Sequence, residues 1–376
     1  MIHVLPESDY PRVREVCSAL ERHLAITAVI ERTAEGAVYV DDPVQPTAAL
    51  VRVGYRFHLS GTPGNETFIA ALRGLFRDEV YPQALLSPRP GMFVLYYSPG
   101  WETDIEVALQ GMHPLTDERV YLECHRPPCD GRPLLPPGFA LRTVNRQLLS
   151  EELANLDALQ EEMCSERASV ADFLARSIGV CVVHGDEIVG WCLSEYNTGD
   201  RCEVGIETTE PYRRRGLATV MTVALVERAR HRGINRIGWE AWASNEASIA
   251  TARKAGFALV DRSPVHYAWF DEAENLSVHG NVHFGSGDYE AAVEWFERAF
   301  RTNKAPAWAY WVAACAYGRL GRETQAFVAL RVALRRGYDD LEAVRRSPHL
   351  ESLRETSAWQ TLMDELEREP PGADGV

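Results

Sequence analysis

Three consecutive arginines precede a glycine and small residues in "PYRRRGLATVM" (residues 211–221), within a chain whose formal net charge is −15. The pattern that follows predicts a helix over residues 215–232. The first turn of a helix has backbone N–H groups without partners and the positive end of the helix dipole, so it attracts anions. Glycine has no Cβ and alanine has only a methyl group, so the backbone can approach a ligand closely. We therefore expect a pyrophosphate-binding segment, which comprises Arg213, Arg214, Arg215, Gly216, Leu217, Ala218 and Thr219.

Two carboxylates precede this segment in the chain. Glu203 and Glu207 lie in "RCEVGIETT" (residues 201–209), which is predicted to be a strand. Alternate residues of a strand share a face, so both carboxylates point the same way, opposite the apolar side chains. A carboxylate in a partly dry cleft has a raised pKa and can act as a general base. The alternative is that both simply face solvent or pair with arginines.

The spacing Arg213-x-x-Gly216-x-Ala218 resembles the Arg/Gln-x-x-Gly-x-Gly/Ala signature of the GNAT superfamily of N-acetyltransferases. A predicted strand precedes it, and "SNEASIATARKAGF" (residues 244–257) is similar to the helix that follows the next strand in that family. The resemblance covers about residues 139–271. It implies a mixed α/β fold that uses acetyl-CoA as the acyl donor and needs no metal.

The resemblance also implies positions for the cofactor. The two central strands, here residues 202–209 and 235–243, would part so that the pantetheine arm runs between them. Backbone groups of Thr208 and Thr209 would contact this arm, and Asn245 would hold it.

Direct transfer to an amine needs a base and an acid. Glu203 or Glu207 would be the base. Many family members have a tyrosine as the acid, at the position that is Ala252 here. Ser248, Tyr267 or water would then have to protonate the leaving thiolate.

The acceptor is less well specified. A small-molecule amine, an antibiotic, a peptide N-terminus and a lysine all stay open. Trp191, Trp239 and Trp242 could line an acceptor pocket, although such side chains more often belong to the core.

Hydrophobic runs place the remaining elements. In the first part, strands are predicted at "TAVIE" (27–31), "GAVYVDD" (36–42), "ALVRVGYRFHL" (49–59), "GMFVLYY" (91–97) and "RVYLEC" (119–124), with helices at about 66–77 and 102–110. In the second part, helices are predicted at about 150–176, 215–232 and 245–255, with two separate final strands, "FALVDRS" and "VHYAWF".

These elements suggest a domain organisation. Residues 1–122 have the strand order of a GNAT fold without its signature, so we expect a degenerate copy, as in tandem GNAT proteins. The first two-thirds also resemble, loosely, the branch that includes antibiotic-modifying acetyltransferases. A proline-rich linker is expected at 123–138, the acetyltransferase domain at 139–271, a helical domain at 272–368 and a tail at 369–376.

The linker contains Cys124, His125 and Cys129. A metal site would need a fourth ligand and usually tighter spacing, so a plain linker is the favoured interpretation. The other cysteines are scattered through apolar runs, as buried thiols are.

The last hundred residues repeat at a shift of 34 residues. Gly280 then falls on Ala314, and Phe296 falls on Leu330. This period, with "GDYEAAVEWFERAF", resembles tetratricopeptide repeats. Two such units cannot bury their apolar faces alone, so we expect them to pack on other parts of the protein or on a second copy, with a peptide or protein partner as the alternative. "AWQTLMDELE" would be a capping helix.

Composition limits the function classes. The acidic balance argues against nucleic acid and anionic membranes as partners. The sequence has no apolar run of membrane length and no signal-peptide core at its start, so a cytoplasmic location is expected. The sequence thus predicts an acetyl-CoA-dependent N-acetyltransferase. The alternative is a non-catalytic acyl-CoA-binding or scaffold protein that uses its helical repeats for protein interaction.

Overall fold

The computed structural model describes residues 1–88, 90–124 and 134–368. Contacts within the chain define two compact units. The first comprises residues 1–74, 94–109 and 116–267, and the second comprises residues 75–93, 110–115 and the chain from Ala268 onward.

The strands form one mixed, twelve-stranded sheet. They are β1 (His3–Val4), β2 (Ala37–Val40), β3 (Ala48–Val53), β4 (Arg56–Gly61), β5 (Met92–Tyr97), β6 (Leu115–Cys124), β7 (Phe139–Thr143), β8 (Gly179–His184), β9 (Glu187–Thr198), β10 (Arg201–Thr208), β11 (Arg236–Trp242) and β12 (Ala258–Trp269). Their order across the sheet is β1-β2-β3-β4-β5-β12-β6-β11-β10-β9-β8-β7.

Helices alternate with these strands. They are α1 (Leu24–Ile30), α2 (Glu66–Leu75), α3 (Tyr81–Ala84), α4 (Glu102–Ala108), α5 (Leu156–Met163), α6 (Val170–Arg176), α7 (Leu217–His231) and α8 (Glu246–Lys254). Short 3₁₀ turns add residues 7–13, 18–20, 148–150 and 210–212, and one π turn joins α2 to α3.

The two halves of the sheet repeat one order of elements. In the first half, the antiparallel strands β2, β3 and β4 are followed by α2 and then by β5, which is parallel to β4. In the second half β8, β9 and β10 lead through α7 to β11, which is parallel to β10. The mixed α/β class predicted from the sequence is confirmed, and the second half carries the arginine-rich segment at the start of α7.

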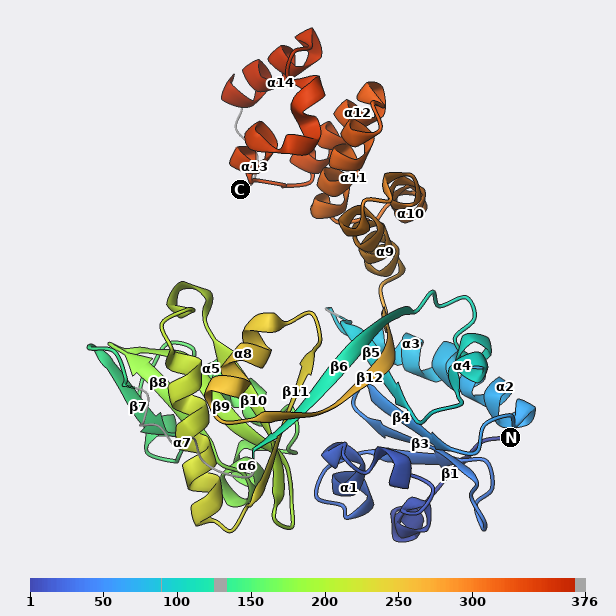
Figure 1. The fold of residues 1–376 in the computed structure, drawn as a ribbon, viewed down its shortest axis with the longest axis vertical. Helices are drawn as coiled ribbons and strands as arrows, with labels where there is room; N and C mark the ends of the chain where they lie inside the picture. The colour runs from blue at the N-terminus through green and yellow to red at the C-terminus, as the bar shows by residue number, and fades with distance from the viewer. Residues whose placement is uncertain (89, 125–133, 369–376) are drawn as a thin grey trace. The chain divides into compact units, whose positions relative to one another are not determined.

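The final strand of each half lies in the other half. Strand β6 pairs with β11, and β12 lies between β5 and β6. Figure 1 shows both long strands running between the two halves of the sheet. The segments on either side of the expected linker are therefore joined through hydrogen-bonded strands. Residues 125–133 of that linker and the expected tail 369–376 lie outside the described residues.

Strand β10 separates two environments. Cys202 and Val204 face α7 and pack in a core with Met221 and Trp239, and Ile206 packs against the same core. The alternate residues of β10, which include Glu203, lie on the opposite face. The alternation along one strand thus gives one apolar and one functional face.

One predicted strand is wrong. "TAVIE" belongs to α1, which packs with β2 and β3 in a separate core. Six of the seven residues of α1 are buried. Such a short, uniformly apolar run carries no periodicity, so the sequence pattern does not distinguish helix from strand.

Three other boundaries also differ. The strand predicted over residues 49–59 is two strands, β3 and β4, with a turn between them. The helix predicted over residues 150–176 is two helices, because Ser169 begins α6 by accepting a hydrogen bond from the Asp172 N–H at 3.1 Å. The two predicted final strands are one continuous strand, β12.

The C-terminal region is all-helical. Its helices are α9 (Glu272–Ser286), α10 (Tyr289–Arg301), α11 (Ala307–Arg319), α12 (Glu323–Arg335), α13 (Leu341–Arg346) and α14 (Ser357–Arg368). The bounds of α12 are those of α10 moved by 34 residues. A Cβ at Gly280 would lie 2.8 Å from the ring of Phe296, so the glycine permits the close approach of α9 and α10. The helical class is confirmed, whereas membership of the tetratricopeptide family stays a prediction.

Candidate active site

Strands β10 and β11 part after three paired residues. The parallel ladder joins Arg201 to Arg236, Cys202 to Ile237 and Glu203 to Gly238. Beyond these pairs, β10 continues along β9, and β11 continues along β6. Among the described residues, the facing edges of β10 and β11 are thus not paired beyond Glu203 and Gly238, and a gap opens toward the carboxyl ends of both strands.

The open end of this gap carries the start of α7. Gly216 stands before the helix with φ +80°, and no side chain caps the first turn. Arg214 also has a left-handed φ of +61°. Left-handed residues in such a turn occur in loops whose successive N–H groups form an anion-binding concavity. A Cβ on Gly216 would meet nothing within 4 Å, so the space in front of the helix is open.

The arginines of this segment frame the helix start. The Nε of Arg213 donates to the Thr208 carbonyl at 2.9 Å, which ties the loop to the end of β10. Arg215 donates to the Pro211 carbonyl at 3.2 Å, and its guanidinium lies over the Tyr212 ring. All three arginines are exposed.

Leu217 is buried and anchors the first turn of α7, whereas Ala218 and Thr219 are half-buried. The uncapped helix, the open space and the flanking cations fit a pyrophosphate.

The three residues predicted to contact the pantetheine arm differ in whether their side chains already have hydrogen-bond partners. The Oγ1 of Thr208 is buried and has no hydrogen-bond partner within the described part of the chain. Thr209 bonds the Val189 carbonyl through both its N–H, at 3.0 Å, and its hydroxyl, at 3.1 Å. Asn245 caps α8, because its Oδ1 accepts from the Ser248 N–H at 3.0 Å. An unpaired buried hydroxyl at Thr208 is the kind of group that a ligand satisfies.

The two candidate bases lie in different surroundings. Glu203 is buried at the last pair of the ladder, and its Oε1 accepts a hydrogen bond from the Leu24 N–H at 3.0 Å. Burial, aided by the nearby Glu240 carboxylate, raises the pKa of Glu203 to about 7. Glu207 lies on the same face but is exposed, opposite Trp191 on β9. Only Glu203 therefore combines burial with a place at the end of the gap.

A second carboxyl group lies beside Glu203. Glu195 on β9 is the cross-strand partner of Glu203, and its carboxylate packs against Gly205. Burial, together with Glu166, raises the pKa of Glu195 to about 8. Both groups are therefore suited to exchange protons near neutral pH.

A third carboxylate on β11 has the opposite environment. Glu240 accepts from the Nε of Arg119 on β6 at 3.2 Å, and Arg119 also lies over the Trp242 ring. Burial alone would raise the pKa of Glu240, but Arg119 and His23 lower it to about 2. Glu240 is thus ionised at neutral pH, and its negative charge explains part of the raised pKa of Glu203.

The first half of the sheet contributes a cation to this cluster. The Nη1 of Arg56 on β4 donates to the Glu166 carboxylate at 2.8 Å and to the Tyr196 hydroxyl at 2.7 Å. Tyr196 has φ +50°, an unusual backbone for an aromatic residue, and it lies where the register of β9 and β10 shifts. This irregularity lets Tyr196 pack into the core of the first half while its hydroxyl meets Arg56.

Two buried histidines, His23 and His58, lie near Glu240. His23 and His58 both pack against the Tyr96 ring, with centroids 4.7 and 4.8 Å apart. Burial lowers the pKa of His23 to about 4 and that of His58 to about 3. Both are therefore neutral near pH 7 and add no positive charge to the cluster.

The predicted acids lie elsewhere. The Oγ of Ser248 accepts from the indole N–H of Trp239 at 3.0 Å on the α7 side of the sheet. Tyr267 on β12 packs against Trp242, with ring centroids 5.1 Å apart. A hydroxyl that the sequence did not suggest is closer to Glu203: a Cβ at Gly238 would lie 3.0 Å from Cζ of Tyr121 and 3.2 Å from Cγ of Glu203.

The three tryptophans divide between core and site edge. Trp191 and Trp239 are buried in two separate cores. Trp242 is half-buried between Arg119 and Tyr267.

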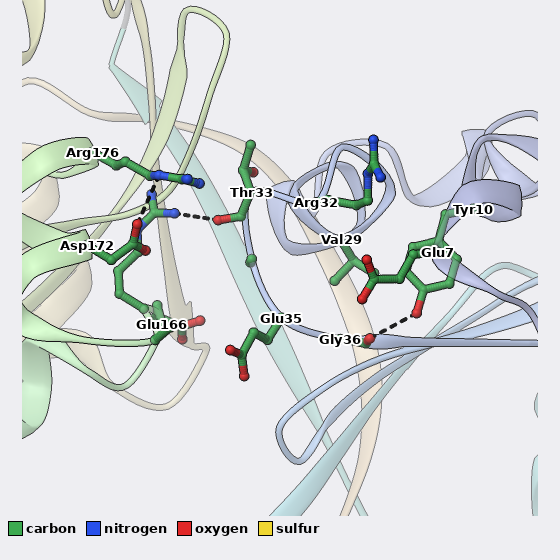
Figure 2. A pocket seen from close by; sticks show the side chains of 13 residues that line it. Glu7, Tyr10, Val29, Arg32, Thr33, Glu35, Gly36, Glu166, Asp172 and Arg176 are labelled. Carbon is green, nitrogen blue, oxygen red and sulfur yellow. Dashed lines mark hydrogen bonds and ion pairs between the residues drawn. The ribbon is translucent and has the colours of Figure 1, made fainter.

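A cavity of about 610 Å³ adjoins Glu166. Figure 2 shows Glu166, Asp172 and Arg176 on one wall and Arg32, Thr33 and Glu35 on the other. The cavity carries charged side chains of both signs, so it suits a polar ligand.

Sequence reasoning missed most of this cluster. Arg56, Glu166 and Glu195 come from segments far apart in the chain. One signal was available: Glu195 and Glu203 interrupt otherwise apolar strands, and ionisable groups in such runs point to functional sites.

Within the described ranges, no three His, Cys, Asp or Glu side chains group as a metal site would require. His125 and Cys129 of the weighed metal site lie outside those ranges. No helix in the part of the chain that the structure describes is long and apolar enough to span a membrane.

Comparisons with known proteins identify the family of the chain. A family model described as GNAT acetyltransferase matches residues 14–265. A Bacillus subtilis (strain 168) protein named "Uncharacterized N-acetyltransferase YdfB" is 27% identical over 247 residues, which are 65% of this chain and 89% of that protein.

Two solved structures are similar in fold. A GCN5-related N-acetyltransferase-like protein from Streptococcus suis 89/1591 is 21% identical with a TM-score of 0.53, covering 70% of this chain and 98% of that one. A GCN5-related N-acetyltransferase from Sphaerobacter thermophilus is 16% identical with a TM-score of 0.50, covering 72% of this chain and 96% of that one.

Proposed function

The chain belongs to the GNAT acetyltransferase family, and we propose that it transfers the acetyl group of acetyl-CoA directly to a primary amine. The observation that carries this proposal is the parting of β10 and β11 immediately after the buried Glu203, with the uncapped start of α7 at the open end. One end of the gap suits a pyrophosphate, and the other holds a proton acceptor.

The donor would be held by the second half of the sheet. Its pyrophosphate would lie against the N–H groups from Arg213 to Thr219, with the arginines supplying positive charge. Its pantetheine arm would occupy the gap, where the free edge of β10 and the hydroxyl of Thr208 offer hydrogen bonds. Asn245 and Thr209 would flank that arm. When bound, acetyl-CoA supplies the thioester that the amine attacks.

Proton transfer would be centred on Glu203. An ammonium acceptor gives one proton to Glu203, and the neutral amine forms a bond to the acetyl carbon while the carbon–sulfur bond breaks. The amine nitrogen then loses its second proton, and the thiolate gains one from the proton donor, so that one proton passes in net from nitrogen to sulfur and coenzyme A leaves as the thiol. A carboxylate with a pKa near 7 matches this task, because it is both ionised and basic at neutral pH. Glu207, which is exposed, is the weaker candidate for the base.

The proton donor to sulfur has three candidate hydroxyls. Ser248 and Tyr267 stay the candidates from sequence, and Tyr121 joins them through its place beside Glu203. Water is the fourth candidate.

The acceptor would be a small-molecule amine or a peptide, in the cytoplasm. The helices from α9 to α14 are proposed to have a structural function first. The side chain of Asn275 donates to the Met112 and His113 carbonyls at 3.2 and 2.9 Å, which supports packing within the second unit. A peptide partner on these helices is the alternative.

Two measurements on the full chain test the proposal. Titration calorimetry with CoA should give binding, and thiol release from acetyl-CoA should depend on an added amine. Glu203→Gln should retain CoA binding while the rate falls about 10²-fold or more, as expected for loss of a general base. Absence of CoA binding, or thiol release at the unchanged rate in Glu203→Gln, would contradict it.

A further inference from the structure

Arg56 projects from the first half of the sheet into the reaction centre of the second half. Its side chain is 44% exposed, although its near neighbours His58 and Tyr196 are 2% and 1% exposed. A ligand can therefore reach part of the Arg56 side chain, although its neighbours are buried. The first half of the sheet therefore contributes a cation to a site built mainly by the second.

The guanidinium of Arg56 is held in place by hydrogen bonds from only one of its three nitrogens. Its Nη1 makes both hydrogen bonds, to Glu166 and to Tyr196. Within the described residues, the N–H groups on Nε and Nη2 have no hydrogen-bond partner, and they are not sealed from solvent. A planar fork held at one nitrogen presents its other edge in a fixed direction, which is the geometry that binds a carboxylate through two hydrogen bonds.

The neighbouring carboxyl groups do not neutralise that open edge. Glu195 makes no hydrogen bond to any described residue, and with a pKa of about 8 it is largely protonated at neutral pH. Glu203 is about half protonated there. Only Glu166 faces Arg56 as a bonded carboxylate, and its pKa is also raised, mainly by burial.

We propose that the acceptor is an amino acid, whose carboxylate binds the open edge of Arg56 while its amine lies at Glu203. This inference rests on the proposed function and adds its substrate class. The acceptor side chain would pass Glu166 toward the adjoining cavity, which has room for it at about 610 Å³. A peptide N-terminus lacks the neighbouring carboxylate and would be a poor acceptor.

Matched amines test the proposal. For the whole protein, kcat and KM are measured with L-serine, L-serinamide and ethanolamine, and with L-histidine, L-histidinamide and histamine. We expect kcat/KM to be about 10²-fold higher for each amino acid than for its amide or decarboxylated amine, mostly through KM. A site built to bond a charged group discriminates strongly against analogues that lack it.

Variants of Arg56 assign the preference to this residue. Arg56→Gln should reduce the ratio of kcat/KM between amino acid and decarboxylated amine to about 1, and Arg56→Lys should keep only part of it. Because Arg56→Gln leaves Glu166 without its cation, the double variant Arg56→Gln/Glu166→Gln is the check on folding, with the same loss of preference expected. Arg14→Gln removes an exposed ion pair with Glu31 in the same half and is the matched control, with the preference retained.

Amides and simple amines that react as well as amino acids, or a preference that survives in Arg56→Gln, would overturn the inference while leaving the acetyltransferase intact. Failure of the proposed function has a different signature, which is the absence of CoA binding and of thiol release with every amine.

Discussion

The carboxylate of Glu195 lies directly against Gly205, so that a Cβ at residue 205 would overlap Oε1 of Glu195. Gly205 follows Glu203 by two residues on the same face of β10, and Glu195 is the cross-strand partner of Glu203. The glycine thus leaves the space in which the two carboxyl groups are neighbours. The Glu195 carboxylate can occupy its position beside Glu203 only because residue 205 has no side chain.

Gly205→Ala tests this relationship. The methyl group should displace the Glu195 carboxylate, while the strand itself accepts alanine because the backbone of Gly205 is not left-handed. We expect kcat to fall about 10²-fold, because the displaced Glu195 carboxylate would disturb the adjacent Glu203, and a misplacement of about 1 Å can cost this much. Steady-state kinetics check the rate, and CoA affinity should be retained. A variant with full kcat would exclude a contribution of Glu195 to the reaction.

The pH dependence of the reaction should report Glu203. Its pKa is raised to about 7, so the ionised form that accepts a proton prevails only above that pH. We expect kcat to rise with pH up to about 7 and to level off above it. In Glu203→Gln this rise should disappear along with most of the activity. An unchanged profile in Glu203→Gln would assign the titration to another group.

Gly216→Asp should abolish CoA binding. Aspartate places a side chain and a negative charge in the open space where the phosphate would approach the helix start. Gly54→Asp is the matched control, because Gly54 also has a positive φ, of +55°, and open space around it, in the turn between β3 and β4. Titration calorimetry compares the two variants. Equal CoA affinity in Gly216→Asp and the wild type would refute the pyrophosphate assignment.

One CoA should bind per chain. In the first half of the sheet, β4 and β5 stay paired from Arg56–Val94 to Leu59–Tyr97, so no gap opens. The start of α2 is also occupied: Asn65 accepts from the Phe68 N–H at 3.1 Å, and Asp104 accepts from the Gly64 N–H at 2.6 Å. A stoichiometry of two in calorimetry would show that the first half binds the donor after all.

Removing the C-terminal helices should destabilise the rest of the chain. Residues 75–93 and 110–115 belong to the same unit as these helices. A chain of residues 1–272 would leave the Met112 and His113 carbonyls without Asn275 and would expose apolar surface. We expect aggregation or a lower melting temperature, measured by light scattering and thermal unfolding. A stable monomer with unchanged melting would favour a partner-binding function for the helices.

The sequence predicted the elements well where their periodicity was clear. Helix α7 and strand β11 lie within two residues of their predicted bounds, because long apolar faces and a terminal glycine marked them. Helix α1 was predicted as a strand, since an apolar run of this length packs equally well in either form.

The candidate site also has a part that could be predicted from the sequence and a part that could not. The segment from Arg213 to Thr219 was accessible from sequence, because a local loop and helix start supply all its groups. Glu195 carried only the signal of a carboxylate in an apolar strand, and Arg56 carried none, since their proximity depends on the pairing of two halves through exchanged strands. A sequence read along the chain contains no local signal for such long-range contacts.

The exchange of β6 and β12 also affects how the protein is made. Strand β12 begins at Ala258, 143 residues after Leu115, where its neighbour β6 begins, and it ends at Trp269. During synthesis the first half of the sheet is complete in sequence before β12 has left the ribosome. Until then the edge of β5 has no partner strand and can pair with other chains. Folding of this sheet is expected to be slow and to finish only after about residue 269 has left the ribosome, with chaperone dependence as its cellular consequence.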